Sequence, residues 1–285
     1  MCWSTVTVTR KDSLNLPYQV QVPCGSCPSC LKKRCKQWAF RLNQEAKESL
    51  SACFLTLTYE VCPFTKNGLP TLSKRHFQLF MKKLRKRVPQ DLPKLKYYAC
   101  GEYGTETHRP HYHMILFNLP HPMINTEVLS KIWNHGFVDV DPRPPGEGSM
   151  HYVSKYIMKR SYQSPDLLDL ETGELVKDDR LKEFSLMSKK LGISYLTKAM
   201  KKYHIERLEM FVTRPGGDKM ALPRYFKDKL ELSEDQLKMI RDAQIEAEQV
   251  HFEKFFKGSN TFKKQWIEDQ FRKERKKFKL ERLKL

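Results

Sequence analysis

Residues 96–117 read KYYACGEYGTETHRPHYHMILF and contain two strand patterns around a short polar turn. The first strand is predicted at residues 96–103 and the second at residues 111–117. Too few residues lie between them for a crossover connection, so the two strands should pair antiparallel. The sequence therefore predicts a β-hairpin with histidines and a glutamate close to its turn.

The patterns on either side of this hairpin predict further strands and helices. Strands are expected at residues 4–10, 18–22, 53–59 and 136–141. Helices are expected at residues 31–49, 73–88, 126–134 and 150–160. This order of elements predicts an α+β fold, in which a central antiparallel sheet is flanked by helices.

Two histidines in the second strand of the hairpin form a candidate metal site. Because strand side chains alternate, His111 and His113 leave the same face of the sheet, about 7 Å apart. Glu102 lies on the neighbouring strand, where its carboxylate can complete a site for Mg²⁺ or Mn²⁺. Cys100 and His108 are alternative third ligands. We prefer Glu102, because a thiolate favours Zn²⁺ and His108 should point away from the pair in an extended strand.

The segment MHYVSKYIMKR at residues 150–160 carries two tyrosines on its predicted helix. Tyr152 and Tyr156 are four residues apart and share a helix face, with Lys155 and Lys159 beside it. Such a pair is usually a packing feature, and a phenol with a pKa of about 10 is a weak nucleophile. It attacks a phosphodiester where a metal polarises the phosphate and a nearby cation favours the phenolate. The chain offers candidates for both.

Four of the eight cysteines lie within twelve residues, at Cys24, Cys27, Cys30 and Cys35. One interpretation is a zinc ion held by three or four of them, with a distant residue completing the site. Their spacing is short for a four-ligand zinc site, whose two ligand pairs usually lie farther apart. The other interpretation is a turn of reduced thiols that leads into the basic helix.

The chain is strongly basic, with 52 Lys and Arg against 33 Asp and Glu and a formal charge of +19. Such an excess suits a polyanionic partner, because each neutralised phosphate releases counterions. Candidate DNA contacts are Lys32, Lys33, Arg34, Lys36, Arg109 and Lys159. No apolar run approaches the roughly 20 residues that span a bilayer, and the N-terminus lacks the apolar core of a signal peptide. We therefore expect a cytoplasmic protein with no membrane partner.

Three domains are expected along the chain. Residues 1–50 form a Cys-rich segment and a basic helix packed on the core, and residues 51–232 form the main domain, with a polar insertion near 161–182. Residues 233–285 form a charged helical C-terminal extension, which begins with a capping-box spacing at Ser233 and Gln236.

Several motifs of the chain occur in a known order. They are TLTY at 56–59, GEYG…HRPHYHMILF at 101–117 and YVSKYIMK at 152–159. In this order they resemble the three motifs of the HUH endonuclease superfamily, whose fold is RRM- or ferredoxin-like. More narrowly, the chain resembles rolling-circle replication initiators of the microviruses, in particular the gokushovirus group. This resemblance covers about residues 20–230 and includes VPCGSCPSCLKKR, FSLMSKKLGISYL and LPRYFKDKL.

The resemblance implies specific roles for the candidate residues. It implies that Tyr152 and Tyr156 are nucleophiles that cut single-stranded origin DNA and form a 5′-phosphotyrosine. It implies that His111, His113 and Glu102 hold Mg²⁺ or Mn²⁺. Lys155 matches the lysine expected to position or neutralise the scissile phosphate. One tyrosine opens a round of replication, and the other cuts the regenerated origin so that the first linkage can be resolved into a circle.

The resemblance also implies partners and a location. No G-x-x-x-x-G-K-[ST] phosphate-binding loop occurs in the sequence, so a host helicase and a host DNA polymerase are expected, in the host bacterial cytoplasm. The oligomeric state is left open. One alternative is a non-catalytic, zinc-stabilised DNA-binding protein. Another is an HUH transposase or relaxase, although a transposase is expected to have one nucleophile and a relaxase a third histidine ligand.

Overall fold

A computed structural model describes most of the chain. The described residues are 2, 5–11, 15–104, 107–141, 166–168, 173, 175–213, 217–240 and 242–243. The chain divides into two compact units, of which Arg34–Ser194 is one and Met1–Lys33 with Tyr195–Leu285 is the other. Among the described residues, no helix combines the length and the apolar character needed to cross a membrane.

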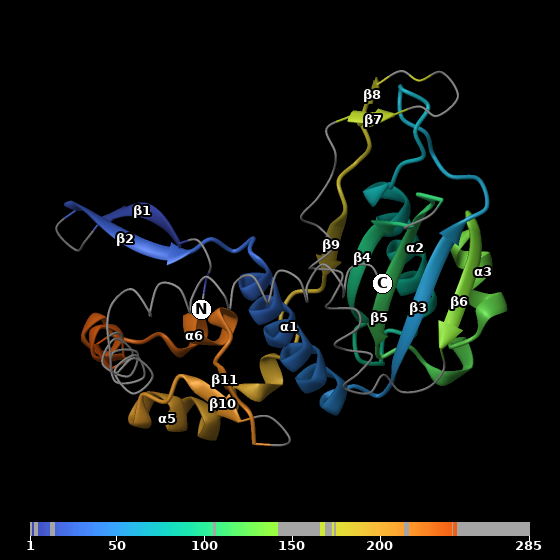
Figure 1. The fold of residues 1–285 in the computed structure, drawn as a ribbon. Coiled ribbons are helices and arrows are strands. Elements are labelled where there is room, and N and C mark those ends of the chain that lie inside the picture. The colour runs from blue at the N-terminus through green and yellow to red at the C-terminus, as the bar shows by residue number, and fades with distance from the viewer. Residues whose placement is uncertain are drawn as a thin grey trace. The chain divides into compact units, whose positions relative to one another are not determined.

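A five-stranded antiparallel sheet lies at the centre of the unit Arg34–Ser194 (Figure 1). Its order is β6-β3-β5-β4-β9, and each neighbouring pair is antiparallel. The strands are β3 (Ala52–Tyr59), β4 (Lys96–Tyr103), β5 (Pro110–Phe117), β6 (Gly136–Asp141) and β9 (Phe184–Met187). The predicted α+β fold with a central antiparallel sheet is therefore confirmed. The sequence did not predict β9, which adds a fifth strand beside β4.

One face of this sheet is apolar and packs against two helices (Figure 1). Along β3 every second side chain is buried, as expected of a strand that covers a core on one face. The helices are α2 (Lys74–Arg87) and α3 (Thr126–Trp133). The predicted apolar stripe of α2 is confirmed, because its buried residues are Phe77, Phe80, Met81 and Leu84. Burial of each such side chain stabilises the fold by about 1.5–3 kcal/mol.

Side-chain caps fix where these two helices begin. The Ser73 hydroxyl accepts a hydrogen bond from the backbone N–H of His76 at the start of α2, at 3.2 Å. The Asn125 side chain accepts from the first N–H groups of α3 in the same way. Each cap satisfies backbone donors that have no partner within the helix, which is worth about 1 kcal/mol. The chain therefore presents the apolar face of each helix to the sheet.

The opposite face of the sheet contacts α1 (Pro28–Glu48), which begins three residues before the predicted start at residue 31. The ring of Trp38 lies 4.8 Å from the ring of Tyr98 on β4, measured between centroids. Farther along α1, the buried carboxylate of Glu45 binds the Lys96 ammonium at 2.6 Å and the Gly192 N–H at 2.8 Å. These contacts fix the second half of α1 against the sheet.

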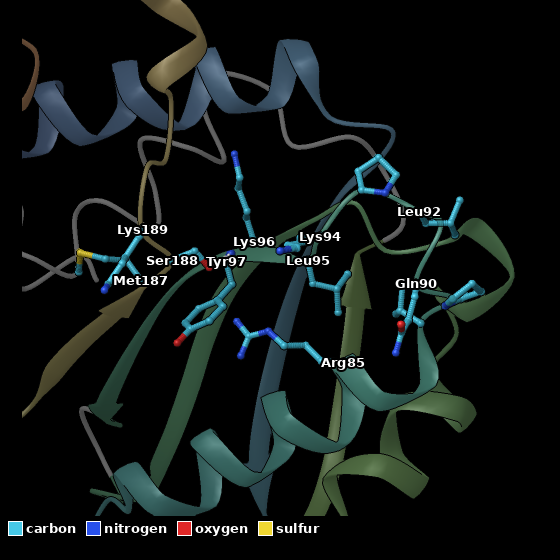
Figure 2. A pocket seen from close by; sticks show the side chains of 13 residues that line it. Arg85, Gln90, Leu92, Lys94, Leu95, Lys96, Tyr97, Met187, Ser188 and Lys189 are labelled. Atoms are coloured by element: carbon cyan, nitrogen blue, oxygen red, sulfur yellow. Dashed lines mark hydrogen bonds between the residues drawn. The ribbon is translucent and has the colours of Figure 1, made fainter. Parts of the chain in front are cut away.

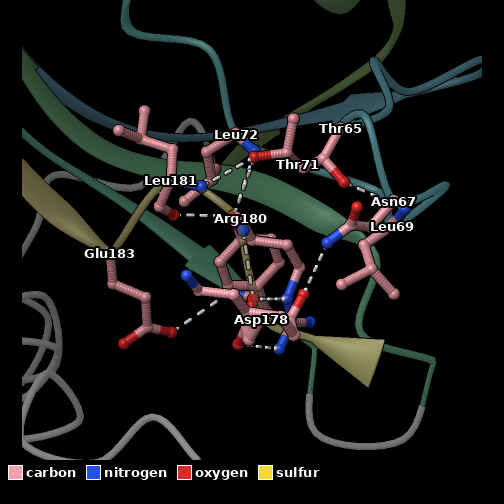
Figure 3. Close-up of polar contacts among 11 residues, drawn as sticks. Thr65, Asn67, Leu69, Thr71, Leu72, Asp178, Arg180, Leu181 and Glu183 are labelled. Atoms are coloured by element: carbon pink, nitrogen blue, oxygen red, sulfur yellow. Dashed lines mark hydrogen bonds and ion pairs between the residues drawn. The ribbon is translucent and has the colours of Figure 1, made fainter. Parts of the chain in front are cut away.

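A polar cluster joins two loops near the ends of β4 and β9, and Figure 3 shows its contacts. The Arg180 guanidinium and the Asp178 carboxylate form a bidentate ion pair, with both bonds at 2.9 Å. The Tyr103 hydroxyl donates to the Leu181 carbonyl at 2.7 Å, and the Thr71 hydroxyl accepts from the Leu181 N–H at 2.9 Å. The cluster therefore ties the segment that leads into β9 to the loop before α2.

The described part of the predicted insertion 161–182 contains a small hairpin. Its strands are β7 (Asp166–Leu168) and β8 (Leu175–Lys177), which pair antiparallel. The Asn67 side chain donates to the Lys177 carbonyl at 2.9 Å, so the end of β8 contacts the β3–α2 loop.

The second unit contains two hairpins and two short helices. Near the N-terminus, β1 (Thr5–Lys11) pairs with β2 (Pro17–Pro23), as the sequence predicts. The later elements are α5 (Lys198–Arg207), β10 (Phe211–Thr213), β11 (Lys219–Ala221) and α6 (Arg224–Leu230). His204 is fully buried and satisfied, with its ring nitrogens bonded to the Tyr195 hydroxyl and the Glu209 carbonyl.

The predicted capping box before the C-terminal extension is confirmed. The Ser233 hydroxyl accepts from the Gln236 N–H at 3.2 Å, and the Gln236 side chain accepts from the Ser233 N–H at 3.0 Å. Residues 234–240 are helical. The rest of the predicted extension, apart from residues 242–243, lies outside the described residues.

Candidate metal centre

Glu102, His111 and His113 converge on one point of the sheet. Glu102 on β4 lies directly opposite His111 on β5, and His113 follows on the same face. The Glu102 Oε1 atom is 2.7 Å from His111 Nε2 and 3.1 Å from His113 Nε2. Two ligand atoms bound side by side to an octahedral Mg²⁺ at about 2.1 Å would lie about 3.0 Å apart. The spacing therefore fits one small cation.

Hydrogen bonds to the far side of each ring orient the two histidines. His111 Nδ1 lies 3.0 Å from the Arg109 carbonyl, and His113 Nδ1 lies 3.1 Å from the Thr56 hydroxyl. A carbonyl oxygen only accepts, so His111 carries a hydrogen on Nδ1, and a neutral His111 ring directs a lone pair at Glu102. That contact is attractive only with a proton or a cation between the two atoms. Metal-binding histidines are commonly oriented by such outer partners.

The three side chains are largely shielded from water. The exposed fractions are 5% for Glu102, 17% for His111 and 12% for His113. Behind them, the Tyr112 side chain points to the apolar face, where its hydroxyl donates to the Ser73 carbonyl at 2.9 Å. Burial raises the pKa of Tyr112 to about 12, so this phenol stays a neutral donor. Tyr112 thus fixes the strand that carries both imidazoles.

The two alternative third ligands lie in other surroundings. Cys100 is buried on β4, and its sulfur lies 3.2 Å from the Ser185 hydroxyl of β9. His108 lies in the turn with a left-handed backbone conformation, at φ 49°. The side chains that cluster within reach of one ion are Glu102, His111 and His113. The structure therefore favours Glu102 as the third ligand.

Arg109, a predicted DNA contact, binds the backbone instead. Its guanidinium donates to the carbonyls of Tyr59 and Glu60 at the end of β3, the second at 2.9 Å. Its own carbonyl accepts from His111. Arg109 thus ties the turn of the hairpin to the neighbouring strand, and its role in DNA binding stays a prediction.

The face that carries the metal centre continues across β3 to the edge strand β6. His111 is paired with Thr58, and Thr58 is paired with Phe137, so the three residues form one row across the sheet. Phe137 is 63% exposed, although it lies in a strand. Closer to the centre, the Phe54 ring stacks on the His113 ring at 5.6 Å. These aromatic residues escaped the sequence analysis, although alternation along β3 and β6 would have placed them on this face.

The predicted tyrosine helix at 150–160 lies outside the described residues. This applies to Tyr152, Tyr156, Lys155 and Lys159. Their positions relative to Glu102, His111 and His113 therefore stay predictions from the sequence.

A second cluster with metal-ligand chemistry lies in the other unit. It consists of Cys2, Cys24, Cys27 and Cys30, whose sulfur atoms lie within 4.8 Å of one another. Three of these were predicted, whereas Cys35 is fully buried within α1 and is not part of the cluster. Because α1 begins at Pro28, Cys30 lies in its first turn and Cys35 more than one turn farther along. Cys2 takes the fourth position.

The predicted basic DNA contacts after the cysteines lie on α1. Lys33, Arg34 and Lys36 are exposed, and Lys32 is half-buried. Their role in DNA binding stays a prediction.

A cavity of about 620 Å³ lies at the far end of the sheet from the metal centre, and Figure 2 shows its lining. Basic side chains surround it, among them Arg85, Lys96 and Lys189. Lys96 and Glu102 are six residues apart on β4, which corresponds to about 20 Å along a strand. The cavity is therefore separate from the metal centre.

Comparisons with known proteins place these features in a family context. Residues 52–161 match the model of a family described as Replication-associated protein ORF2. The matched segment includes Glu102, His111 and His113, and also the tyrosine pair. No solved structure matches the chain.

Three curated relatives are similar over most of the chain. Replication-associated protein ORF4 of Chlamydia phage 1 is 29% identical over 76% of this chain and 56% of its own length. Replication-associated protein ORF2 of Spiroplasma virus 4 is 29% identical over 80% and 74%. Replication-associated protein VP4 of Bdellovibrio phage phiMH2K is 26% identical over 78% and 71%. The match thus spans little more than half of the Chlamydia phage protein. Residues 52–161 belong to the Replication-associated protein ORF2 family, within a chain related over most of its length to phage replication-associated proteins.

Proposed function

We propose that this chain initiates rolling-circle DNA replication by nicking and rejoining single-stranded DNA. The observation that carries the proposal is the convergence of Glu102, His111 and His113 on one point, within the segment that matches the replication-associated family. A purely DNA-binding protein has no need of two imidazoles and a carboxylate oriented toward each other at 2.7 and 3.1 Å.

Glu102, His111 and His113 would hold one Mg²⁺ or Mn²⁺. The donor set of one carboxylate and two imidazoles suits these ions, and it leaves coordination positions for a phosphate oxygen. A bound ion would withdraw negative charge from the scissile phosphate and make its phosphorus easier to attack. The role of the protein is to hold the ligands in place through Thr56, the Arg109 carbonyl and Tyr112.

The proposed nucleophiles are Tyr152 and Tyr156. The phenolic oxygen of one tyrosine forms a bond to phosphorus while the bond from phosphorus to the 3′ oxygen breaks. The DNA then carries a 5′-phosphotyrosine on one side and a free 3′-OH on the other. The phenolic proton leaves to solvent and the 3′ alkoxide gains one, so neither ATP nor another co-reactant is consumed. Lys155 is proposed to stabilise the phosphate charge.

Two nucleophiles allow the reaction to close a circle. After one round of synthesis, the second tyrosine attacks the regenerated origin and releases a new 3′-OH. This hydroxyl attacks the first phosphotyrosine, which restores a phosphodiester and frees the first tyrosine. Unwinding and synthesis are proposed to come from a host helicase and a host DNA polymerase.

The DNA strand is proposed to cross the open face of the sheet from the metal centre toward β6. Thr58 and Phe137 continue the row that starts at Glu102 and His111. Neighbouring strands lie about 4.8 Å apart, so Phe137 is about 10 Å from His111, within the reach of one or two nucleotides. An exposed aromatic ring is a stacking surface for an unpaired base.

A covalent-adduct assay tests the proposal. Single-stranded oligonucleotides that tile the DNA encoding the chain are incubated with the protein and Mn²⁺, then analysed on a denaturing gel. We expect one oligonucleotide to yield a protein–DNA adduct and a fragment with a free 3′-OH. The adduct should be absent without divalent metal and in the Tyr152→Phe/Tyr156→Phe double variant.

Two outcomes would contradict the proposal. If no oligonucleotide forms an adduct, the chain is better described as a DNA-binding protein stabilised by its cysteine cluster. If the double variant still forms the adduct, another residue is the nucleophile. Tyr18→Phe, in the exposed hairpin β1–β2, is the matched control and should form adduct at the wild-type rate.

A further inference from the structure

Four cysteines from separate parts of the N-terminal segment meet at one place. Cys2 comes from the N-terminus, Cys24 directly follows β2, Cys27 precedes α1 and Cys30 lies in the first turn of α1. All four sulfur atoms lie within 4.8 Å of one another. None of the eight cysteines, all of which lie in the described part of the chain, forms a disulfide.

The distances between the sulfur atoms fit a tetrahedral metal ion. Four sulfur atoms at about 2.3 Å from a central Zn²⁺ would lie about 3.8 Å from one another. The Cys2 sulfur is 3.5 Å from that of Cys24 and 3.9 Å from that of Cys27. A disulfide needs about 2.05 Å between its sulfur atoms, so these separations are too long for a bond and too short for chance neighbours.

Backbone N–H groups already point at the sulfur atoms. The Cys27 N–H donates to the Cys24 sulfur at 3.3 Å, and the Cys24 N–H donates to the Cys2 sulfur at 3.3 Å. Gly25 makes this turn possible, because its φ of +74° lies in the left-handed region. These hydrogen bonds lower the pKa of Cys24 to about 6, whereas burial raises that of Cys30 to about 12. A cation is needed to hold both sulfurs as thiolates together.

The hairpin β1–β2 lacks a core of its own. Of its fourteen residues, the structure leaves eleven exposed and three half-buried, with none fully buried. An isolated two-stranded hairpin is marginally stable in water. A small segment without a core is commonly held by a disulfide or a metal, and disulfides are absent among the described residues. The cysteine cluster lies where both ends of the hairpin meet α1.

We propose that Cys2, Cys24, Cys27 and Cys30 bind one structural Zn²⁺ that joins the N-terminus and the β1–β2 hairpin to the start of α1. Four thiolates fill all four positions of a tetrahedral zinc ion, so this site is closed and does not take part in nicking. The partial positive charge of the α1 N-terminus favours the thiolate of Cys30. The site is independent of the metal centre on the sheet, whose oxygen and nitrogen ligands suit Mg²⁺ or Mn²⁺.

Metal content tests the proposal on the full chain. The protein purified without added chelator should contain one zinc per chain by mass spectrometry of the elements. The Cys2→Ser/Cys27→Ser double variant should contain none, whereas Cys62→Ser, which alters a half-buried thiol of the other unit, should retain one. His113→Ala should also retain it. Zinc retained in the double variant, or absent from the wild-type protein, would overturn the proposal.

Cobalt substitution tests the geometry without any variant. Wild-type protein freed of metal and reconstituted with Co²⁺ should show the intense visible absorption of a tetrahedral cobalt–thiolate site. A spectrum of octahedral cobalt, or iron with sulfide in the native protein, would contradict the zinc assignment. These readouts do not depend on nicking. An active nickase without zinc would refute only the zinc site, and a zinc protein without adduct formation would refute only the proposed function.

Removal of zinc should also release the hairpin. Trypsin cleaves after Arg10 and Lys11, which are exposed residues of β1. We expect the rate of cleavage there to rise at least about tenfold after chelation, because the metal no longer closes the ends of the hairpin. An unchanged rate would show that zinc does not hold this segment.

Discussion

At the residue scale, the orientation of His113 depends on neighbours that bind no metal themselves. The Thr56 hydroxyl holds Nδ1 at 3.1 Å, and the Phe54 ring stacks on the imidazole at 5.6 Å. Loss of an outer partner of a metal ligand typically lowers metal affinity or activity 10- to 100-fold. The sequence places Thr56 only two residues before Thr58, so the two threonines can be compared on one strand face.

We expect Thr56→Val to weaken Mn²⁺-dependent adduct formation. The substitution keeps the shape and removes the hydroxyl, so the His113 ring loses its outer partner and the Mn²⁺ concentration for half-maximal adduct should rise about 10-fold. The matched control is Thr58→Val, because His111 is held by the Arg109 carbonyl instead. A titration of adduct yield against Mn²⁺ measures both variants. Equal curves for the two would show that Thr56 does not orient a ligand.

Phe137 allows a test of the proposed DNA path. We expect Phe137→Ala to weaken single-stranded DNA binding about 5- to 150-fold, since stacking of a base on an aromatic ring is worth about 1–3 kcal/mol. Stability should change by less than about 0.5 kcal/mol, because the side chain is 63% exposed. Phe64→Ala, which removes an equally exposed ring from the β3–α2 loop, is the control. Fluorescence anisotropy with both variants decides the path, and equal affinities would contradict it.

At the element scale, Glu45 links α1 to the sheet and to the loop after β9. Its two carboxylate oxygens bind Lys96 and the Gly192 N–H, and only 4% of the residue is exposed. Glu45→Ala leaves an ammonium and a buried N–H without this acceptor. We expect a loss of about 2–3 kcal/mol in the free energy of unfolding, measured with urea. Glu48→Ala, at the exposed end of α1, should change it by less than about 0.5 kcal/mol.

Two stacked histidines beneath the sheet predict a dependence of stability on pH. The rings of His76 and His135 lie 4.3 Å apart, and burial lowers the pKa of both. The folded protein thus binds fewer protons than the unfolded chain between the lowered pKa values and about 6.5. Stability should therefore be complete above about pH 6.5 and fall as the pH drops below it. His135→Phe removes one of the two titrations, and its Tm should fall less than that of the wild type between about pH 7 and 5.

The main elements of the sheet were predictable because each signal is local. Alternation in β3 and β5, the Ser73 cap and the apolar stripe of α2 act within a few residues of one another. β9 was missed because its four residues, FSLM, have no pattern of their own and form a strand only by pairing with β4. Tertiary context overrides weak local preference in such short segments.

The candidate site was predictable to the same extent. Glu102, His111 and His113 share a face because hairpin register and strand alternation are short-range rules, and the structure brings them together. Cys2 was missed because no local rule links it to Cys24, twenty-two residues later. The first turn of α1 decides which later cysteine can join, and its start at Pro28 leaves Cys35 out. Long-range closure of this kind is invisible to periodicity.

At the scale of the whole molecule, charge and chemistry should separate in experiments. The net charge of +19 acts on any DNA backbone, whereas the metal centre acts on one phosphate. His113→Ala should abolish the adduct yet bind single-stranded DNA within about twofold of the wild-type affinity, because it removes no Lys or Arg. If the variant loses binding as well, the histidines are needed for the fold or for DNA recognition rather than for metal.

The salt dependence of that binding is the remaining prediction. If about six phosphates are neutralised, the logarithm of the association constant should fall with the logarithm of salt concentration at a slope near about −4. Raising monovalent salt from about 50 to 200 mM should then weaken binding by about 250-fold. Anisotropy titrations at several salt concentrations measure the slope for the wild type and for His113→Ala, which should agree. A slope near zero would mean that the basic surface does not contact the DNA backbone, and that stacking on residues such as Phe137 supplies most of the affinity.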